Sequence, residues 1–291
     1  MASDFRLSPN RRDRIVKALR YAARPQIMGI LNTTDDSFYA DSRTMNQEAV
    51  DRGTAMVDAG ASWVDIGGES TRPGAEPVSV ETELQRVLPV IQGLRSARPD
   101  ALISVDTRNH TVAEAALEAG ADMVNDVSGL RDPAMVDVVL RTGCAVCIMH
   151  MQGEPRTMQT EPHYDDVVGE VGAALEQTKQ MLVQRGHPAD LIVVDPGIGF
   201  GKKQHHNLKL LDAGKNLLLG DGSILWGVSR KSVVGHLTGR ADPADRLPGT
   251  LGLAAVAHRM QIDILRVHDV EAHVDLFCAM DGLSTHTENV E

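Results

Sequence analysis

Eight short apolar runs, most of them followed by a stretch with helical spacing, constrain the fold of this chain more than any other feature of its sequence. Strands that are apolar along their whole length are typical of parallel sheets covered by helices. Eight such units can close into a barrel, although counting them leaves a doubly wound open sheet as an alternative. The predicted strands span residues 27–32, 63–68, 102–107, 122–127, 145–151, 191–195, 224–229 and 264–268. Helical spacing is clearest over residues 80–94, 110–119, 165–185 and 251–259.

Polar side chains at the ends of the predicted strands favour the barrel over the open sheet. Nearly every strand ends in a group that can do chemistry, as at a barrel mouth, whereas an open sheet would concentrate such groups at one switch point. The groups are Asn32, Asp65 with Glu69, Asp106, Asn125 with Asp126, His150, Asp195, Ser229 with Arg230 and Lys231, and Arg266 with His268. We therefore predict an α/β fold with a single (β/α)8 TIM barrel over residues 26–284, a short N-terminal helical extension over residues 1–25 and a polar tail over residues 285–291.

Charge and hydropathy exclude two classes of partner. The net charge of −11 argues against nucleic acid, whose phosphates bind clustered Lys and Arg. No apolar run approaches the roughly 20 residues of a membrane-spanning helix, so we expect no membrane partner and a cytoplasmic protein. The first 25 residues are rich in Arg but lack the apolar core of a secretory signal. A transit peptide is one interpretation of this segment, and we favour a short helix beginning near Ser8 that covers the bottom of the barrel.

Three shorter motifs have structural explanations. Cys144 and Cys147 have redox spacing but lie in an apolar, strand-like run, which favours core packing. Residues 197–202 are rich in Gly but lack the spacing of a phosphate-binding loop, and we predict a mobile connection between strand and helix. His205 and His206 have no third ligand at helical spacing, so we expect them at the surface.

Nine segments, in order along the chain, resemble dihydropteroate synthase, a family of pterin-binding TIM barrels. They are 28–32 (MGILN), 36–38 (DSF), 65–74 (DIGGESTRPG), 104–107 (SVDT), 125–126 (ND), 149–153 (MHMQG), 195–202 (DPGIGFGK), 229–232 (SRKS) and 266–268 (RVH). The resemblance implies a transferase of folate biosynthesis that joins 6-hydroxymethyl-7,8-dihydropterin pyrophosphate to p-aminobenzoate, giving 7,8-dihydropteroate and pyrophosphate. It also implies Mg2+ as the cofactor and a homodimer.

The resemblance assigns Asp106, Asn125, Asp195 and Lys231 to the pterin ring. Ionised carboxylates only accept hydrogen bonds while an amide also donates, which suits the donor-rich edge of a pterin. Met149, Ile30, Phe200 and Gly227 are implied as the walls of the pterin site. For p-aminobenzoate the implied residues are Phe38, Thr71, Arg72, Pro73 and Ser229.

The leaving pyrophosphate is implied to lie against Arg266 and His268, with Mg2+ held by Asn32. Because Arg266 and His268 are two residues apart, an extended strand would project both to one side. The same alternation places Asn125 and Asp126 on opposite faces. It also separates Ser229 and Lys231 from Arg230, provided that the strand runs that far. With no nucleophile triad, catalysis would come from preorganised charge at Lys231, Asp106, Asp195, Arg266 and His268.

Two alternative functions remain open, and the sequence departs from the family pattern in the first loop and at Trp226. A pterin-binding methyltransferase-type barrel or a non-catalytic homologue would share the Asp/Asn/Asp edge, but the methyltransferases should not need segments 65–74 and 229–232. Family members usually have Val and Pro where this chain has Thr33 and Asp35, and a small aliphatic residue at Trp226. From the loop change we derive the hypothesis that the enzyme is less sensitive to sulfonamides.

Overall fold

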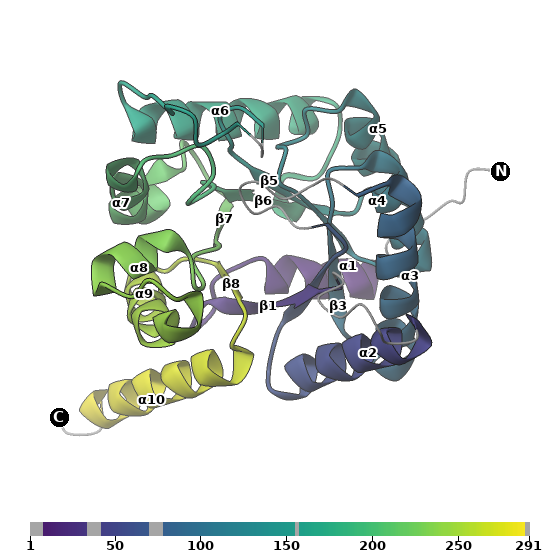
Figure 1. Cartoon of the computed structure of the whole chain (residues 1–291), viewed down its shortest axis with the longest axis horizontal. Helices are drawn as coiled ribbons and strands as arrows, with labels where there is room; N and C mark the ends of the chain where they lie inside the picture. The colour runs from purple at the N-terminus through teal and green to yellow at the C-terminus, as the bar shows by residue number, and fades with distance from the viewer. Residues whose placement is uncertain (1–7, 34–41, 70–77, 155–156, 289–291) are drawn as a thin grey trace.

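Eight parallel strands form a closed barrel in chain order, which confirms the predicted TIM barrel and excludes the open sheet (Figure 1). The computed structural model describes residues 8–33, 42–69, 78–154 and 157–288. The strands are β1 (Gln26–Asn32), β2 (Trp63–Gly67), β3 (Leu102–Asp106), β4 (Met123–Asp126), β5 (Ala145–Met149), β6 (Ile192–Asp195), β7 (Ser223–Trp226) and β8 (Ile264–Val267). All overlap their predicted ranges, although β7 ends at Trp226 instead of continuing to Ser229.

Helices surround the barrel, and their ends follow from local sequence. They are α1 (Pro9–Ala18), α2 (Ser42–Asp58), α3 (Val80–Ala97), α4 (His110–Ala119), α5 (Pro133–Thr142), α6 (Val167–Gln184), α7 (Gln204–Ala213), α8 (Ser232–Thr238), α9 (Leu247–Arg259) and α10 (Val270–Glu288). In α5 the Asp132 side chain accepts a hydrogen bond from the Ala134 N–H at 2.9 Å, and Pro133 occupies the first turn. Gly143 ends this helix with a left-handed φ of 64°. Helix α10 continues to Glu288, within the segment predicted as a polar tail.

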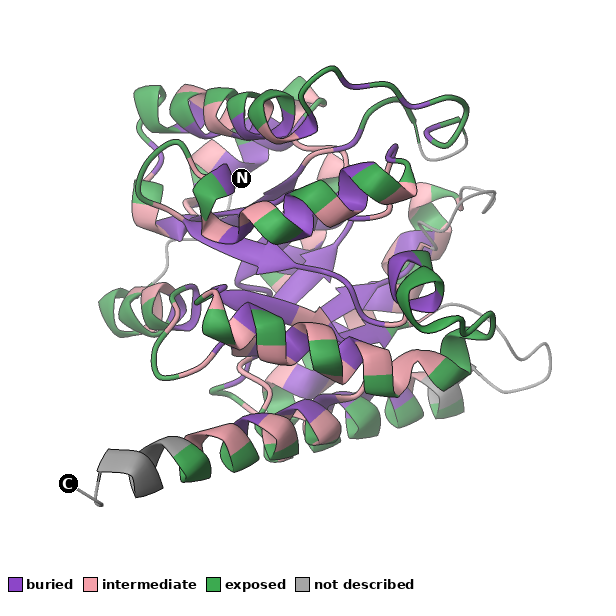
Figure 2. Cartoon of the chain, turned by 90° about the vertical axis from the view of Figure 1, so that its left-hand side faces the viewer, coloured by how far each residue is buried: buried purple, intermediate pink, exposed green. Residues whose placement is uncertain are grey.

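Alternation along the strands divides the barrel into an outer and an inner layer. Outward residues such as Ile66 and Val105 pack in the large core beneath the helices. Inward residues near the strand starts, such as Trp63 and Met123, fill the bottom of the barrel. Figure 2 shows the strands buried along their length, while the helices expose one side. The inward positions near the strand ends are polar, and they form the mouth.

Helix α1 closes the bottom of the barrel, as predicted. Its Ile15 and Leu19 side chains are fully buried in the same cluster as Trp63. The Trp63 indole N–H donates to the Ala18 carbonyl at 2.9 Å. The Ser8 side chain accepts from the Arg11 N–H at the start of the helix. Burial of the helix's apolar face therefore fixes it beneath the strands.

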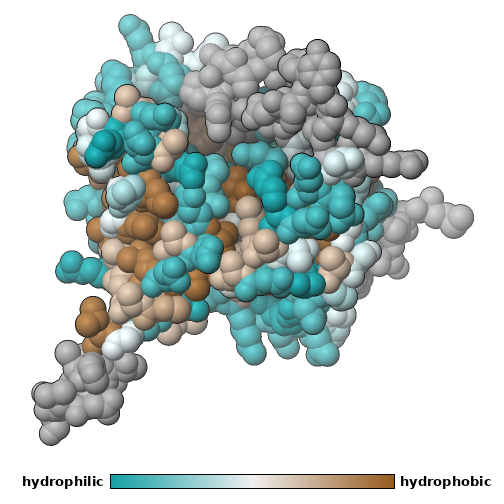
Figure 3. Space-filling model, turned by 60° about the horizontal axis from the view of Figure 1, so that its bottom comes forward, coloured by the Kyte–Doolittle hydropathy of each residue, from teal (hydrophilic) through white to brown (hydrophobic). Residues whose placement is uncertain are grey.

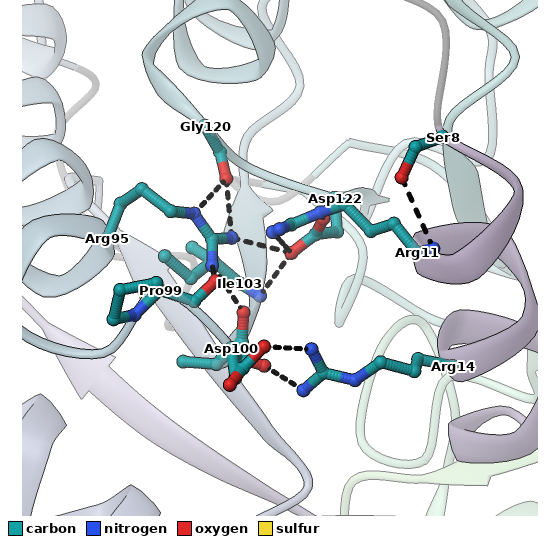
Figure 4. Close-up of polar contacts among 10 residues, drawn as sticks. Ser8, Arg11, Arg14, Arg95, Pro99, Asp100, Ile103, Gly120 and Asp122 are labelled. Carbon is teal, nitrogen blue, oxygen red and sulfur yellow. Dashed lines mark hydrogen bonds and ion pairs between the residues drawn. The ribbon is translucent and has the colours of Figure 1, made fainter.

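A buried carboxylate attaches α1 to the barrel wall (Figure 4). Asp122 has no exposed surface and forms ion pairs with Arg11 of α1 and Arg95 of α3. The same side chain accepts from the Ile103 N–H at 2.9 Å. A buried charge needs this degree of pairing, because leaving it unpaired would cost several kcal/mol.

The structure places all three shorter motifs, and the surface prediction holds for His205 but was wrong for His206, which is 5% exposed. Cys144 and Cys147 are fully buried, and burial raises the pKa of the Cys144 thiol to about 11, so both are core residues as predicted. The loop over residues 197–202 connects β6 to α7, as predicted, and hydrogen bonds join it to the segment before α6. Gly199 and Gly201 carbonyls accept from Gln159 and the Tyr164 hydroxyl at 2.7 and 2.9 Å.

Among the described residues, no helix combines the length and hydropathy needed to cross a membrane.

Candidate active site

The mouth of the barrel collects the polar residues that follow the strands. Strand register sets Asp106 beside Asn125 and, two residues lower, Asp65 beside Ser104. On the other side of the mouth, Met149 lies beside Asp195. All are inward positions, and Asp65, Asp106, Asn125 and Asp195 are groups that the sequence marked as strand ends, so the structure brings these four to one place.

An arginine and two carboxylates form the acidic side of the mouth. Arg266 donates from Nε to Asp65 and from Nη2 to Asp106, each at 2.6 Å. Burial raises the pKa of Asp106 to about 7, although Arg266 opposes the shift. Burial lowers the pKa of Arg266, but Asp65 and Asp106 outweigh it and hold that pKa above its usual value. Arg266 is therefore permanently cationic, while Asp106 titrates near neutrality.

Asp65 connects Arg266 to Asn125. The Asn125 amide donates from Nδ2 to the same Asp65 oxygen at 3.1 Å, and Asp65 has no exposed surface. Sequence analysis noted Asp65 as a strand end but assigned it no role. The signal that could have identified it is its inward position, two residues before the end of an apolar strand.

Two lysines form the basic side of the mouth. Lys231 donates to the Ile198 carbonyl at 2.6 Å, and its Nζ lies 4.5 Å from the centre of the Phe200 ring. Burial lowers the pKa of Lys231 to about 8, while Asp195 opposes the shift. Asp195 accepts from the Gly197 N–H at 2.7 Å, and burial raises its pKa against the effect of Lys231.

Lys202 is a buried residue of this side that sequence analysis missed. Its side chain donates to the Phe200 and His150 carbonyls at 2.9 and 3.1 Å. Burial lowers the pKa of Lys202 to about 7. The only sequence signal was its place at the end of the glycine-rich segment. Lys202 therefore joins the loop after β6 to the end of β5, beneath Phe200.

Residues 229–231 lie in a turn after β7, and not in the strand that we predicted for them. Because β7 ends at Trp226, alternation does not apply there, and Arg230 has a φ of +58° that few side chains adopt. Ser229 Oγ nevertheless lies 3.0 Å from His268 Nδ1, and the charge of Asp195 acts on Lys231 by raising its pKa against the effect of burial. Arg230 pairs instead with Asp269 at 3.0 Å. The side chains of Lys231 and Arg230 therefore point to different partners, as predicted. The cause is the turn and not alternation along a strand.

Arg266 and His268 make different contacts at the end of β8. Arg266 points into the barrel toward the two carboxylates, whereas His268 contacts Ser229 through both its ring and its backbone N–H. Asp126 faces outward, where it accepts from the Ser128 and Leu130 N–H groups at 2.8 and 2.9 Å. The prediction that Asn125 and Asp126 lie on opposite faces of the strand is therefore confirmed.

Apolar residues separate the two polar sides. Met149 is buried in a small cluster against which Phe200 packs, and Ile30 is buried in β1. A side chain at Gly227 would begin 3.7 Å from both Asp195 Oδ2 and Lys231 Nζ, so glycine keeps the space between them open. Trp226 is fully buried in the outer core, so it does not reach the mouth.

Several predicted residues lie outside the described part of the chain. These are Asp35, Phe38, Thr71, Arg72 and Pro73. Thr33, just before the first of these segments, donates to the Gly67 carbonyl from its N–H and its hydroxyl, at 2.9 and 3.1 Å.

The end of β1 offers a ligand for a metal ion that binds together with a phosphate group. Asn32 is exposed at the end of β1 and offers one amide oxygen. Within the described residues, no three His, Cys, Asp or Glu side chains are grouped for a metal ion. Mg2+ characteristically binds through one or two protein oxygens together with substrate phosphates, so Asn32 fits this mode.

A cavity of about 820 Å3 lies at the opposite, N-terminal end of the barrel. Its lining includes Lys17, Tyr21 and Arg98, and none of the strand-end residues described above. Active sites of TIM barrels lie at the C-terminal ends of the strands, so the polar mouth is the catalytic candidate.

Comparison with known proteins gives one consistent result. A family model described as "Pterin binding enzyme" matches residues 28–268. The dihydropteroate synthase of Escherichia coli K12 is 41% identical over 267 residues, covering 91% of this chain and 94% of the relative. The Yersinia pestis dihydropteroate synthase, solved with a sulfonamide drug complex, has a TM-score of 0.83 and 39% identity, covering 90% of this chain and 95% of that one. The Burkholderia cenocepacia dihydropteroate synthase, complexed with 7,8-dihydropteroate, has a TM-score of 0.82 and 40% identity, covering 91% and 94%.

Proposed function

The chain belongs to the pterin binding enzymes and, within them, to the dihydropteroate synthases, and from this premise we propose how its barrel mouth performs that reaction. Asp106, Asn125 and Asp195 accept from the donor-rich edge of the dihydropterin, and Lys231 donates to its carbonyl. The observation that carries this proposal is the division of the mouth into a carboxylate side and a lysine side around apolar walls. The methyltransferase alternative is removed by the identity to dihydropteroate synthases.

Catalysis rests on charge that is already in place before substrate binds. When pyrophosphate leaves, the pterin methylene becomes electron-poor, and the carboxylates of Asp106 and Asp195 stabilise the positive charge that develops there. Arg266 has five N–H donors and uses two on carboxylates, so others remain for the leaving pyrophosphate. His268 and Asn32 complete the phosphate side, and Mg2+ bound at Asn32 would neutralise the leaving group.

The amine of p-aminobenzoate then attacks the methylene. Ser229, which contacts His268, is the described residue assigned to this substrate. Phe38 and Thr71 to Pro73, in the segments after β1 and β2, complete the proposed binding site. An aromatic amine is nucleophilic without a strong base, so the proposed reaction needs no nucleophile triad.

Replacement of Lys231 tests this proposal. We expect Lys231→Ala to lose turnover by at least about 100-fold, because preorganised donors of this kind contribute that much. Product formation and pyrophosphate release would be measured with and without p-aminobenzoate, with circular dichroism to establish folding. A folded variant with near-normal turnover would refute the assignment. Pterin binding by the unchanged chain without any pyrophosphate release would support the non-catalytic homologue instead.

We also propose a homodimer through α8, α9 and α10. Leu237, Val256 and Leu283 are 51%, 42% and 73% exposed on these three helices. Figure 3 shows brown, hydrophobic surface along the lower left of the molecule. Exposed apolar residues that cluster on one face are typical of interaction surfaces. Light scattering during gel filtration would give the mass in solution.

A reduced response to sulfonamides is the remaining proposal. Thr33 links the start of the first loop to the end of β2, the strand that precedes Thr71 to Pro73. With Asp35 in place of a proline, the unfolded chain gains conformational entropy worth roughly 0.4–1 kcal/mol. The same freedom of the backbone should change the free energy of closing the loop around a ligand. The ratio of the sulfonamide inhibition constant to the KM for p-aminobenzoate should therefore fall in the double variant Thr33→Val, Asp35→Pro.

A further inference from the structure

We propose that Asp65 is a positioning residue that sets the hydrogen-bond polarity of the pterin site by fixing the orientation of the Asn125 amide. The inference rests on the proposed function, because it takes Asn125 to contact the pterin. It adds a residue that determines which pteridines are accepted.

The contacts of Asp65 leave Asn125 one orientation. Arg266 Nε donates to Asp65 Oδ2 at 2.6 Å, and a carboxylate paired with a guanidinium only accepts hydrogen bonds. Asn125 meets the same oxygen at 3.1 Å, so its amide must present the nitrogen there. The Asn125 oxygen therefore faces away from Asp65. Reversing the amide would set two acceptors against each other in a fully buried place.

The fixed amide adds an acceptor to a site that already presents acceptors. Asp65 Oδ1 and Asp106 Oδ1 are buried and have no partner among the described residues. Such atoms are costly to leave unmet, and they are satisfied by the donors of a ligand or a water molecule. A pterin (2-amino-4-oxopteridine) supplies donors from its amino group and ring N–H. Lumazine (2,4-dioxopteridine) has a carbonyl in place of the amino group, so it meets acceptors with an acceptor.

Replacing Asp65 with alanine should free the amide of Asn125. Asparagine would not do so, because Arg266 and Asn125 donate to the same oxygen of Asp65, and an asparagine oxygen in that place would accept from both. Without an acceptor there, the Asn125 amide can turn its N–H groups to the ligand, and the site then offers a donor where it had an acceptor.

The experiment compares the dissociation constants of pterin and lumazine by calorimetric titration. Effects common to both ligands, including ring stacking and changes around Arg266, cancel in the ratio of the two constants. We expect Asp65→Ala to reduce the preference for pterin by about tenfold or more, as expected for losing at least one hydrogen bond to a charged group. Asp126→Ala is the matched control, because it removes a buried carboxylate next to Asn125 that faces outward. Its preference should stay unchanged.

Three outcomes distinguish this inference from the proposed function. If Asp65→Ala binds pterin with an unchanged preference, the inference is wrong. If Asn125→Ala leaves the pterin affinity unchanged, the proposed placement of the pterin fails and the inference fails with it. If Asp65→Ala does not fold, Asp65→Asn decides, because its oxygen can still accept from both Arg266 and Asn125. Asn125→Ala made in that variant should then lower the pterin preference by the same factor as in the unchanged protein, and a smaller loss overturns the inference.

Discussion

Burial and pairing compete at each charged residue of the mouth. Arg266 is paired by two carboxylates, so its charge is fixed, whereas burial raises the pKa of Asp106 to about 7 despite its pairing. The pKa of Lys231 is shifted the other way, to about 8, because burial disfavours its ammonium. The two residues proposed to bind opposite edges of the pterin therefore both change charge near neutral pH.

These shifts predict a bell-shaped dependence of kcat/KM on pH. Burial raises the pKa of Asp106 against Arg266, with Asp65, Glu83 and Asp126 adding to the rise, so the accepting carboxylate forms only as pH rises through about 7. Burial lowers the pKa of Lys231 against Asp195, so its ammonium is lost as pH rises through about 8. The profile for the free enzyme should therefore have its maximum between these values.

Initial rates at low pterin substrate, from about pH 5.5 to about pH 9.5, would test the assignment of each limb. Asp106→Asn should remove the acid limb and Lys231→Met the basic limb, each at reduced rate. The ionisation of the substrate's own pyrophosphate is the same in all three proteins. An acid limb that persists in Asp106→Asn would show that another group causes it.

At the level of elements, two aspartates just before strands attach the closing helix to the barrel. Asp122, before β4, pairs with Arg11 of α1 and accepts from Ile103 N–H. Asp263, before β8, accepts from the Tyr21 and Ile224 N–H groups at 2.7 and 3.0 Å. Each aspartate thus joins a neighbouring strand to the N-terminal segment, at opposite sides of the barrel bottom.

We predict that Arg11→Met destabilises the fold without changing catalysis. Loss of its hydrogen bonds to the buried Asp122 should lower the free energy of unfolding by about 1–3 kcal/mol. Arg14→Met is the control, because the Arg14–Asp100 pair is exposed and such pairs contribute about 0–1 kcal/mol. Both variants should keep kcat/KM, since the mouth lies at the other end of the barrel. Urea unfolding that shows equal losses in the two variants would contradict this role for Asp122.

Local patterns predicted the elements well because their causes are local. Apolar runs predicted all eight strands, and the Ser8–Pro9 start predicted α1. The turn at residues 229–231 was missed, because the left-handed backbone at Arg230 has no signature in an arginine. The role of Asp65 was missed for another reason. Its partner Arg266 lies 201 residues away, and only closure of the barrel brings the two together.

At the scale of the whole molecule, a net charge of −11 acts against an anionic substrate. The cations of the mouth are few and partly committed, since Arg266 pairs with two carboxylates and Lys231 approaches Asp195. The pyrophosphate substrate adds several negative charges of its own. Local neutralisation must therefore overcome a repulsive surrounding field.

This balance predicts that the pyrophosphate substrate binds weakly without Mg2+, whereas pterin lacking pyrophosphate binds equally well with or without it. Calorimetric titrations in EDTA and then in excess Mg2+ would measure both ligands. Raising the salt concentration should partly replace Mg2+, because the Debye length falls from about 10 Å at 0.1 M to about 3 Å at 1 M, and the repulsion is screened. Asn32→Ala should remove most of the Mg2+ effect, while the affinity for pterin alone stays the same. If the unchanged protein binds the pyrophosphate substrate equally in EDTA and in Mg2+, then Arg266 and His268 suffice for the phosphates, and Asn32 is not a metal ligand.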